Sequence, residues 1–215
     1  MKKLSLAILL AIFSLAIHAQ EGFSIEPISP AVKARIMGKS YPKEGARISL
    51  ADLRYLRVKH YDAEGKIKNG EIIVNKSIAN DVLEIFKELF RIKYPIEQMK
   101  LIDEYDAVDE ISMRHNNTSG FCYRVVKGSK SLSKHSLGMA IDINPLFNPC
   151  FKLDPTGKSA YKKGTLQPAN AEKYVSRKNV FAYTITAQVI AIFKKHGFRW
   201  GGDWRTMKDY QHFEK

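Results

Sequence analysis

Alternation of apolar and polar side chains marks the first regular element of this chain. Residues 53–61 read LRYLRVKHY, and a second segment of strand-forming residues ends in EIIVN at residues 71–75. The sequence DAEG at residues 62–65, between the two segments, is typical of a tight turn. Two such segments around a turn predict a β-hairpin.

Helical spacing of apolar residues predicts two substantial helices. Residues 82–90 carry apolar side chains three or four positions apart, and Tyr94-Pro95 ends this pattern. Such a helix needs a polar cap, and Ser77 or Asn80 is in the right place to provide it. A second helix is expected over residues 184–197, with Thr184 as its cap and a glycine as its end.

Shorter elements are expected around these. Ser29-Pro30 predicts the start of a short helix that ends at Gly38. Residues 99–103 and 121–126 favour strands, and the acidic segment at residues 104–110 favours a solvated turn. Two helices, a hairpin and several short strands predict an α+β fold, with a small, mainly antiparallel sheet flanked by helices.

The first residues have the order of a secretory signal peptide. Lys2 and Lys3 precede an apolar run at residues 4–17, which ends in small and polar residues. We expect residues 1–19 to be removed by cleavage after Ala19, with an uncleaved signal anchor as the alternative. The run is short for a membrane span, so no stable span is expected after cleavage.

The domain organisation follows from these assignments. A lead-in with a short helix is expected at residues 20–47, and a single globular domain at residues 48–215. The signal predicts export to the periplasm or the medium. We expect the exported protein to be a monomer.

The net charge of the chain is +13 at pH 7, and it falls to +11 when Lys2 and Lys3 leave with the signal. The basic residues are scattered and no nucleic-acid motif accompanies them, so a nucleic-acid partner is not expected. An exported basic protein meets anionic polymers of the cell wall instead. Simple solubility explains the charge equally well.

The chain contains two cysteines, Cys122 and Cys150. In an exported protein they are candidates for a disulfide, which would stabilise the fold by about 3 kcal/mol in the loop-entropy model. Two separate buried thiols are the alternative.

An imidazole and a carboxylate stand out in the segment SKHSLGMAIDINP at residues 133–145. Asp142 lies in an apolar stretch that favours a short buried strand, and a buried carboxylate is costly without a cation or hydrogen-bond donor. Gly138 allows the backbone to turn tightly or to approach another segment, which would bring His135 back toward Asp142. One nitrogen and one oxygen ligand make half of a zinc site.

The other half is expected near the C-terminus, where WGGDW at residues 200–204 precedes DYQHFE at residues 209–214. His212 is the natural third ligand. Two histidines and an aspartate leave one tetrahedral position for water, which is the arrangement of a catalytic zinc ion, one per chain.

A hydrolytic site also needs a base and a cation. Asp209 lies three residues before His212, on the opposite face of a regular strand, so a turn or bulge before Tyr210 is required to bring both to one site. Arg124 lies among residues that favour burial and would meet an oxyanion or a substrate carboxylate. An ion pair with an acid of the core is the alternative for Arg124. The proline-containing loop at residues 144–166 is of the kind that borders a binding cleft.

The motifs S-x-H-x-x-G-x-A-x-D at residues 133–142, W-G-G-D-W and D-Y-Q-H-F-E, with TSGFCYR at residues 118–124, together resemble a known family. They are similar to the zinc D-alanyl-D-alanine carboxypeptidases and dipeptidases of the VanX/VanY type. This family also includes L-alanyl-D-glutamate endopeptidases of phage lysins. The resemblance extends from about Ile28 to the C-terminus and implies a fold like that of the Hedgehog proteins and these peptidases.

The resemblance implies roles for individual residues. By this likeness His135, Asp142 and His212 bind zinc, Asp209 is the catalytic base and Arg124 stabilises the transition state. It also implies that Ser133 holds the terminal carboxylate of the substrate.

Three aromatic residues are expected to contact the substrate: Trp200, Trp204 and Tyr210. For the two tryptophans, packing in the core is the alternative.

The sequence therefore predicts an exported zinc metallopeptidase that acts on peptidoglycan stem peptides, with removal of a C-terminal D-alanine as the expected reaction. Cleavage within the stem or cross-link by an endopeptidase is one alternative. A non-catalytic, zinc-stabilised cell-wall-binding domain, as in Hedgehog-type relatives, is another. The presence of both Asp209 and Arg124 argues against the binding domain, because a purely structural metal site needs neither.

Overall fold

The computed structural model describes residues 22–126 and 130–215. The expected signal peptide at residues 1–19 lies outside the described residues. Among the helices of the described part, none has the length and apolar character that crossing a membrane requires.

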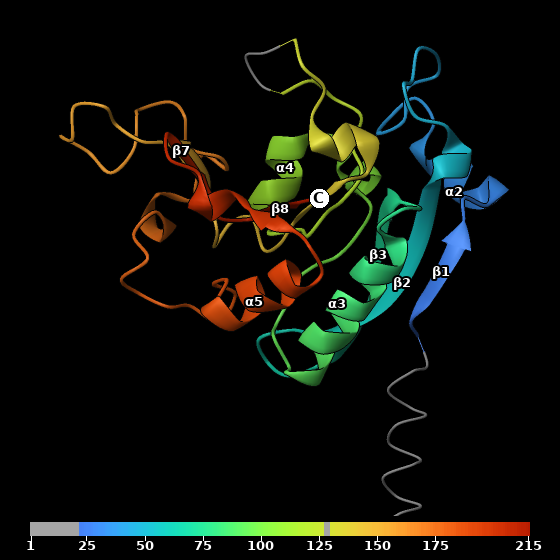
Figure 1. Ribbon diagram of the computed structural model, residues 1–215, viewed down its shortest axis with the longest axis horizontal. Coiled ribbons are helices and arrows are strands. Elements are labelled where there is room, and N and C mark those ends of the chain that lie inside the picture. Colours follow the sequence, from blue (N-terminus) through green and yellow to red (C-terminus); the bar gives the residue numbers. More distant parts are fainter. Residues whose placement is uncertain (1–21, 127–129) are drawn as a thin grey trace, which may run out of the picture.

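A three-stranded antiparallel sheet forms one side of the molecule (Figure 1), with strands β1 (Ser24–Pro27), β2 (Leu53–Tyr61) and β3 (Ile67–Asn75). β2 and β3 pair along all nine of their residues, so the predicted hairpin is confirmed. The connecting turn is held by Asp62, whose carboxylate accepts hydrogen bonds from the backbone N–H groups of Glu64 and Lys66.

The main apolar core lies between this sheet and two helices, α3 (Ala79–Arg91) and α5 (Ala187–Lys195). The buried side chains of α3 are those with helical spacing, among them Ile85, Phe86 and Leu89. They face the sheet because a helix with one apolar stripe buries that stripe. Phe213, near the C-terminus, stacks on Phe193 of α5 with ring centroids 3.8 Å apart. The last strand is thereby anchored in the same core.

A second apolar cluster lies against the residues of the sheet that the first does not use, including Tyr55 and Ile73. Helix α2 (Pro30–Ile36) covers it. The hydroxyl of Ser29 accepts a hydrogen bond from the N–H of Val32, so the predicted start of this helix is confirmed. The strand β1, in the lead-in, pairs with β2.

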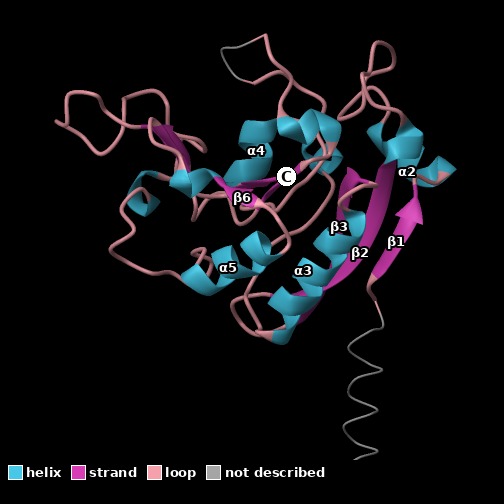
Figure 2. Cartoon of the chain, in the orientation of Figure 1, coloured by secondary structure: helices cyan, strands magenta, loops and turns pink. Residues whose placement is uncertain are grey.

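The remaining part of the molecule is built from very short elements joined by long loops (Figure 2). These elements are helix α4 (Asp109–Arg114) and strands β4 (Ala140–Asp142), β5 (Cys150–Lys152), β6 (Arg199–Trp200), β7 (Met207–Asp209) and β8 (His212–Glu214). The strands form two antiparallel sheets, in the orders β4-β8-β6 and β5-β7. The α+β fold class with small antiparallel sheets is confirmed.

Both predicted caps of the long helices were wrong. In α3 no side chain caps the N-terminus, since the hydroxyl of Ser77 donates to the Asn75 side chain. In α5 the cap is Thr186, whose hydroxyl accepts from the N–H of Val189. Thr184 instead accepts from the backbone of the loop before the helix.

The strand predicted at residues 99–103 was also wrong. A 3-10 helix, η2 (Ile102–Tyr105), begins there, and the Asp103 carboxylate accepts hydrogen bonds from the N–H and hydroxyl of Ser40. The acidic segment that follows ends in the first turn of α4.

Residues 121–126 do not form a regular strand. The backbone N–H groups of Phe121, Cys122 and Tyr123 donate to three different partners, on Ile73, His135 and Ser40 respectively. This segment is therefore hydrogen-bonded to the hairpin, to the segment that carries His135 and to the loop after α2.

Candidate functional site

The two histidines and the aspartate expected to bind metal come together at the centre of the molecule. Asp142 ends β4 and lies directly opposite His212, the first residue of β8. His135 is supplied by the 3-10 helix η3 (Lys134–Leu137), which precedes β4. All three side chains are buried, and one ligand atom of each lies within 4.8 Å of the others.

The turn that carries His135 is fixed at both ends. The hydroxyl of Ser133 accepts a hydrogen bond from the N–H of His135 and caps η3. At the other end Gly138 adopts a φ of +66°, and a Cβ there would lie 2.6 Å from the backbone nitrogen of Asn75. Only glycine fits this position, because it accepts a positive φ and leaves room for the end of the hairpin. The predicted close approach at Gly138 is confirmed.

The ligand atoms have the spacing of a tetrahedral metal site. His135 Nε2 lies 3.2 Å from Asp142 Oδ2 and 3.3 Å from His212 Nδ1, and His212 Nδ1 lies 3.0 Å from Asp142 Oδ1. Ligands bound to one zinc ion at about 2.0 Å in tetrahedral geometry lie about 3.3 Å from one another. The three residues therefore form a face that fits such an ion.

The outer nitrogen of each imidazole has its own partner. His135 Nδ1 donates to the carbonyl oxygen of Gly120 at 2.6 Å, and His212 Nε2 donates to Glu214 Oε2 at 3.4 Å. These bonds direct His135 Nε2 and His212 Nδ1 toward the shared centre. Partners of this kind orient metal-binding histidines and raise their basicity.

The charged groups in the cluster shift one another's pKa values. Burial alone would lower the pKa of His212, but hydrogen bonds to Asp142 and Glu214 outweigh it and raise this pKa to about 10. Burial likewise opposes ionisation of Asp142, yet the two imidazoles hold its pKa well below the usual value. The centre thus favours a positive charge beside the carboxylate, which a proton or a metal ion can supply.

Asp209 comes from a different strand and lines the same cavity as the three cluster residues. It ends β7 and lies opposite Cys150 of β5, so the break between β7 and β8 separates it from His212. A Cβ on Gly201 would lie 2.8 Å from the Cβ of Asp209, which explains a glycine there. The chain bends at Tyr210 and Gln211, directly after β7, so a break between Asp209 and His212 is present, although at Tyr210 and not before it.

The Asp209 carboxyl is in an unusual environment. Burial raises its pKa to about 6, and the negative charge of Asp142 adds to this effect. Its Oδ1 is shut off from solvent and has no hydrogen-bond partner. A carboxyl group with a pKa this close to neutrality can accept and release a proton at physiological pH.

Arg124 lines the cavity and is held by two contacts. Its backbone N–H donates to the hydroxyl of Ser136, which in turn donates to the Arg124 carbonyl. Its Nη2 lies 2.8 Å from Asp109 Oδ2, while its Nε is buried without a partner. Arg124 thus faces the cavity and also makes an ion pair, although with the start of α4 and not with an acid of the core.

The other residues expected to bind substrate divide into two groups. Ser133 and Trp204 line the cavity, and the Trp204 ring lies 5.5 Å from that of His212. Trp200 and Tyr210 are not among the described residues that line the cavity. Trp200 packs against the main core and donates from Nε1 to the Tyr210 carbonyl, while the Tyr210 ring lies under the Arg177 guanidinium. The expected contact of Trp200 and Tyr210 with a substrate stays a prediction.

The expected disulfide is not formed in the structure, where Cys122 and Cys150 are both buried free thiols. Each has a charged neighbour of its own, Arg124 for Cys122 and Asp209 for Cys150. Burial raises the pKa of the Cys122 thiol to about 12 and that of Cys150 well above its usual value. The alternative of two separate buried thiols describes the structure.

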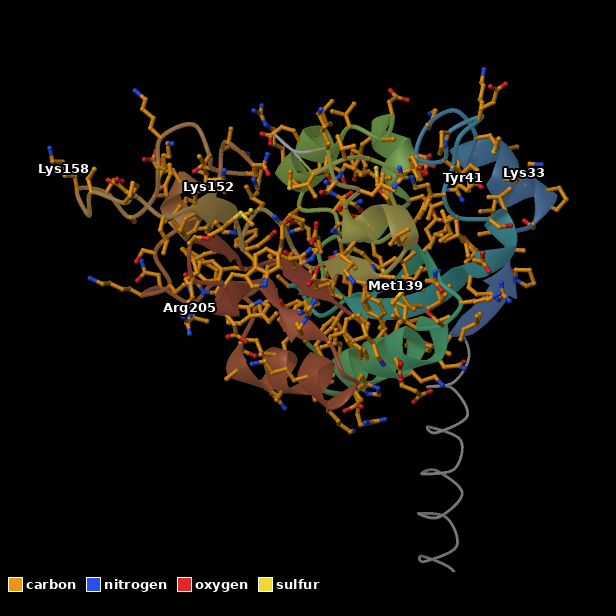
Figure 3. All side chains as sticks on the ribbon, turned by 45° about the horizontal axis from the view of Figure 1, so that its top comes forward. Lys33, Tyr41, Met139, Lys152, Lys158 and Arg205 are labelled. Carbon is orange, nitrogen blue, oxygen red and sulfur yellow. The ribbon has the colours of Figure 1, made fainter. Side chains whose placement is uncertain are left out.

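The cluster opens into a cavity of about 960 Å³. Its walls come from α4, from residues on both sides of the 127–129 segment, from β5 and β7, and from the loop after β5. That loop contributes Tyr161, Leu166 and Gln167, so the predicted role of residues 144–166 beside a cleft is confirmed. Figure 3 shows Lys158 at its far end, away from the body of the molecule, and Lys152 nearer its base.

Comparison with known proteins agrees with the resemblance seen in the sequence. Residues 127–215 match the model of a peptidase family. Its description is D-alanyl-D-alanine carboxypeptidase. The resemblance to this family is confirmed over that part of the chain, which contains the three cluster residues and Asp209 but not Arg124. No solved structure matches the chain significantly.

Several residues that shape the site were not predicted from the sequence. Glu214 could have been found, because it lies two positions from His212 and therefore on the same face of a strand. No sequence pattern pointed to Asp109, since its contact with Arg124 depends on the placement of α4. The Ser136 hydroxyl bonds to the backbone of Arg124, and the Gly120 carbonyl oxygen accepts from His135. No local pattern reveals such contacts between distant segments.

Proposed function

We propose that this protein is an exported zinc metallopeptidase that removes a C-terminal D-alanine from peptidoglycan stem peptides. The observation that carries the proposal is the set of three buried ligand atoms 3.0–3.3 Å apart, which share a cavity with Asp209 and Arg124. The family match supports the peptidase chemistry and the class of substrate.

In this proposal His135, Asp142 and His212 hold one zinc ion. When bound, zinc supplies Lewis acidity, which activates water and polarises a peptide carbonyl. Asp209 accepts a proton from the attacking water at its unpartnered Oδ1 and passes it to the leaving amine nitrogen. A raised pKa suits both halves of this transfer, because the group must gain and lose the proton at similar pH.

Arg124 binds the oxygen on which negative charge develops. Its Nε is a buried donor without a partner, so a substrate oxygen would satisfy it. Asp109 holds the far end of the guanidinium and limits its movement. Ser133, whose hydroxyl oxygen already accepts from His135, still has a hydroxyl hydrogen to donate to a substrate carboxylate.

Endopeptidase cleavage is the second candidate. A cavity of about 960 Å³ is near the upper limit for small-ligand sites, so it has room for several residues of a peptide. A binding domain without turnover is less well supported, since it leaves the raised pKa of Asp209 and the buried Arg124 Nε without a use.

The deciding experiment is mass spectrometry of purified stem peptides, with and without a terminal D-alanine, after incubation with the zinc-loaded protein. Loss of one alanine supports the carboxypeptidase, and an internal cut supports the endopeptidase. An unchanged mass for every peptide would contradict both and favour the binding domain.

The Asp209→Asn variant tests the assigned base. We expect its rate to fall by roughly 10²–10⁴-fold, the usual contribution of a general base, while zinc stays near one equivalent per chain. The exposed Asp203, replaced in the same way, is the matched control and should keep full activity. Loss of zinc in Asp209→Asn would show that Asp209 is a ligand instead.

A further inference from the structure

Three buried side-chain polar atoms in the described residues have no hydrogen-bond partner: Arg124 Nε, Asp209 Oδ1 and Gln211 Oε1. All three belong to residues that line the same cavity. An unpaired buried polar atom is costly, so folded proteins keep few of them. Their collection around one cavity indicates that a ligand with complementary groups satisfies them.

The proposed mechanism uses Arg124 and Asp209 but leaves Gln211 without a role. Gln211 is 2 % exposed, and it lines the cavity into which the three cluster residues open. Its backbone is firmly held, since the carbonyl oxygen of Gln211 accepts from the N–H of Ile143 at 3.0 Å. The side chain therefore starts from a fixed point between β7 and β8.

The unpaired atom of Gln211 is a carboxamide oxygen, which can only accept. Its partner must be a donor brought by the occupant of the cavity. A peptide substrate carries such donors in its backbone N–H groups. The N–H of the residue whose carbonyl is attacked suits a fixed acceptor best, because the leaving nitrogen changes its protonation during the reaction and this N–H does not.

We propose that Gln211 is a substrate-binding residue whose side-chain oxygen accepts a hydrogen bond from the peptide N–H of the residue on the N-terminal side of the scissile bond. The inference rests on the proposed peptidase function and adds a contact that sets the register of the peptide. Arg124 then binds a substrate oxygen while Gln211 binds a substrate N–H. Together the two residues recognise an acceptor and a donor of the peptide backbone.

The test compares two substrates and three forms of the zinc-loaded protein. One substrate is acetyl-L-Lys-D-Ala-D-Ala, and the other has D-lactate in place of the first D-alanine. The second substrate replaces one N–H with an ester oxygen and keeps the scissile amide. Release of D-alanine gives kcat/KM for the wild type, Gln211→Met and Gln211→Glu.

We expect the wild type to prefer the amide substrate about tenfold, the effect of one hydrogen bond. Gln211→Met, which keeps the shape but loses the acceptor, should cleave the amide substrate about tenfold more slowly than the wild type does. It should lose nothing further on the ester substrate. Gln211→Glu keeps an acceptor and should keep a preference for the amide. Zinc content and thermal unfolding midpoint are measured for all three forms.

Two results would overturn the inference while leaving the proposed function intact. One is equal cleavage of both substrates by the wild type, a result that needs no variant. The other is a loss in Gln211→Met of the same size on both substrates. If the wild type releases no D-alanine from either substrate, the proposed carboxypeptidase activity fails, and the inference fails with it.

Discussion

The hairpin region of this protein, residues 24–96, and its ligand region, residues 118–152 and 199–215, are built on different principles. β2 and β3 are nine residues long and pair throughout, whereas β4, β5, β7 and β8 have three residues each. The buried side chains of the hairpin region are mostly apolar. Those of the ligand region include many polar groups: Ser119, Ser133, His135, Ser136, Asp142, Asn144, Asn148, Gln211 and His212.

This difference shows that one region of the fold mainly provides stability, while the other holds the polar groups of the site. The stabilisation from burying apolar side chains adds up over the buried area and depends little on exact geometry. It can therefore stabilise the hairpin region. Convergent polar groups are costly when unpaired, so each must be fixed by its own partner. A hydrogen bond of this kind also joins the two regions, since the Gly138 carbonyl oxygen accepts from the N–H of Asn75.

The largest expected effect comes from removing a ligand. His212→Ala should lose bound zinc and all hydrolysis, because the three-atom face is broken. Hydrogen exchange should then speed up in β4 and β8 while β2 and β3 stay protected. Elemental analysis and exchange mass spectrometry check this, with the exposed His115→Ala as control. Full zinc content in His212→Ala would refute its assignment as a ligand.

The converse change acts on the hairpin region. Phe86 is 1 % exposed in the main core, so Phe86→Ala should lower the free energy of unfolding by about 3–5 kcal/mol. Zinc stoichiometry of the folded protein should stay unchanged, since the ligands lie elsewhere. Urea unfolding measures the loss, and Phe90→Ala, at a partly exposed position of the same helix, should cost less. A loss of zinc in Phe86→Ala would show that the two regions are not separable.

A smaller effect is expected where the ligand region depends on single hydrogen bonds. The Asn148 amide donates to the carbonyl oxygens of Asn144 and Tyr183, and its oxygen accepts from the N–H of Ile185. Asn148→Ala removes these bonds and takes the partner of the buried Ile185 N–H, which should cost about 1–3 kcal/mol. Thermal unfolding is the measurement, and the exposed Asn170→Ala should be neutral. Equal stability of both variants would contradict this role.

The last expected effect concerns pH. The pKa of His212 is raised to about 10 in the metal-free cluster, so a proton occupies the site below that pH and must leave when metal binds. Zinc affinity should therefore rise with pH, by about tenfold per unit between pH 6.5 and 8.5 for this one proton. Competition with a chelator at several pH values measures it. An affinity independent of pH would mean that His212 is already neutral.

Local patterns in the sequence were enough to predict a large part of the fold. Alternation around a turn predicted β2 and β3, and helical spacing predicted α3 and α5, because these elements are stabilised by contacts between residues close in sequence. Residue type and order also indicated the His135, Asp142 and His212 set, since few side chains serve as zinc ligands.

Only the tertiary structure decided which groups meet across long separations. The pairing of β4 with β8 sets Asp142 opposite His212, and the placement of α4 gives Arg124 its partner Asp109. It also left Trp200 and Tyr210 outside the described lining of the cavity and left Cys122 and Cys150 as free thiols. The physical reason is that such contacts depend on packing of the whole chain, which leaves no periodic trace in the segments that it joins.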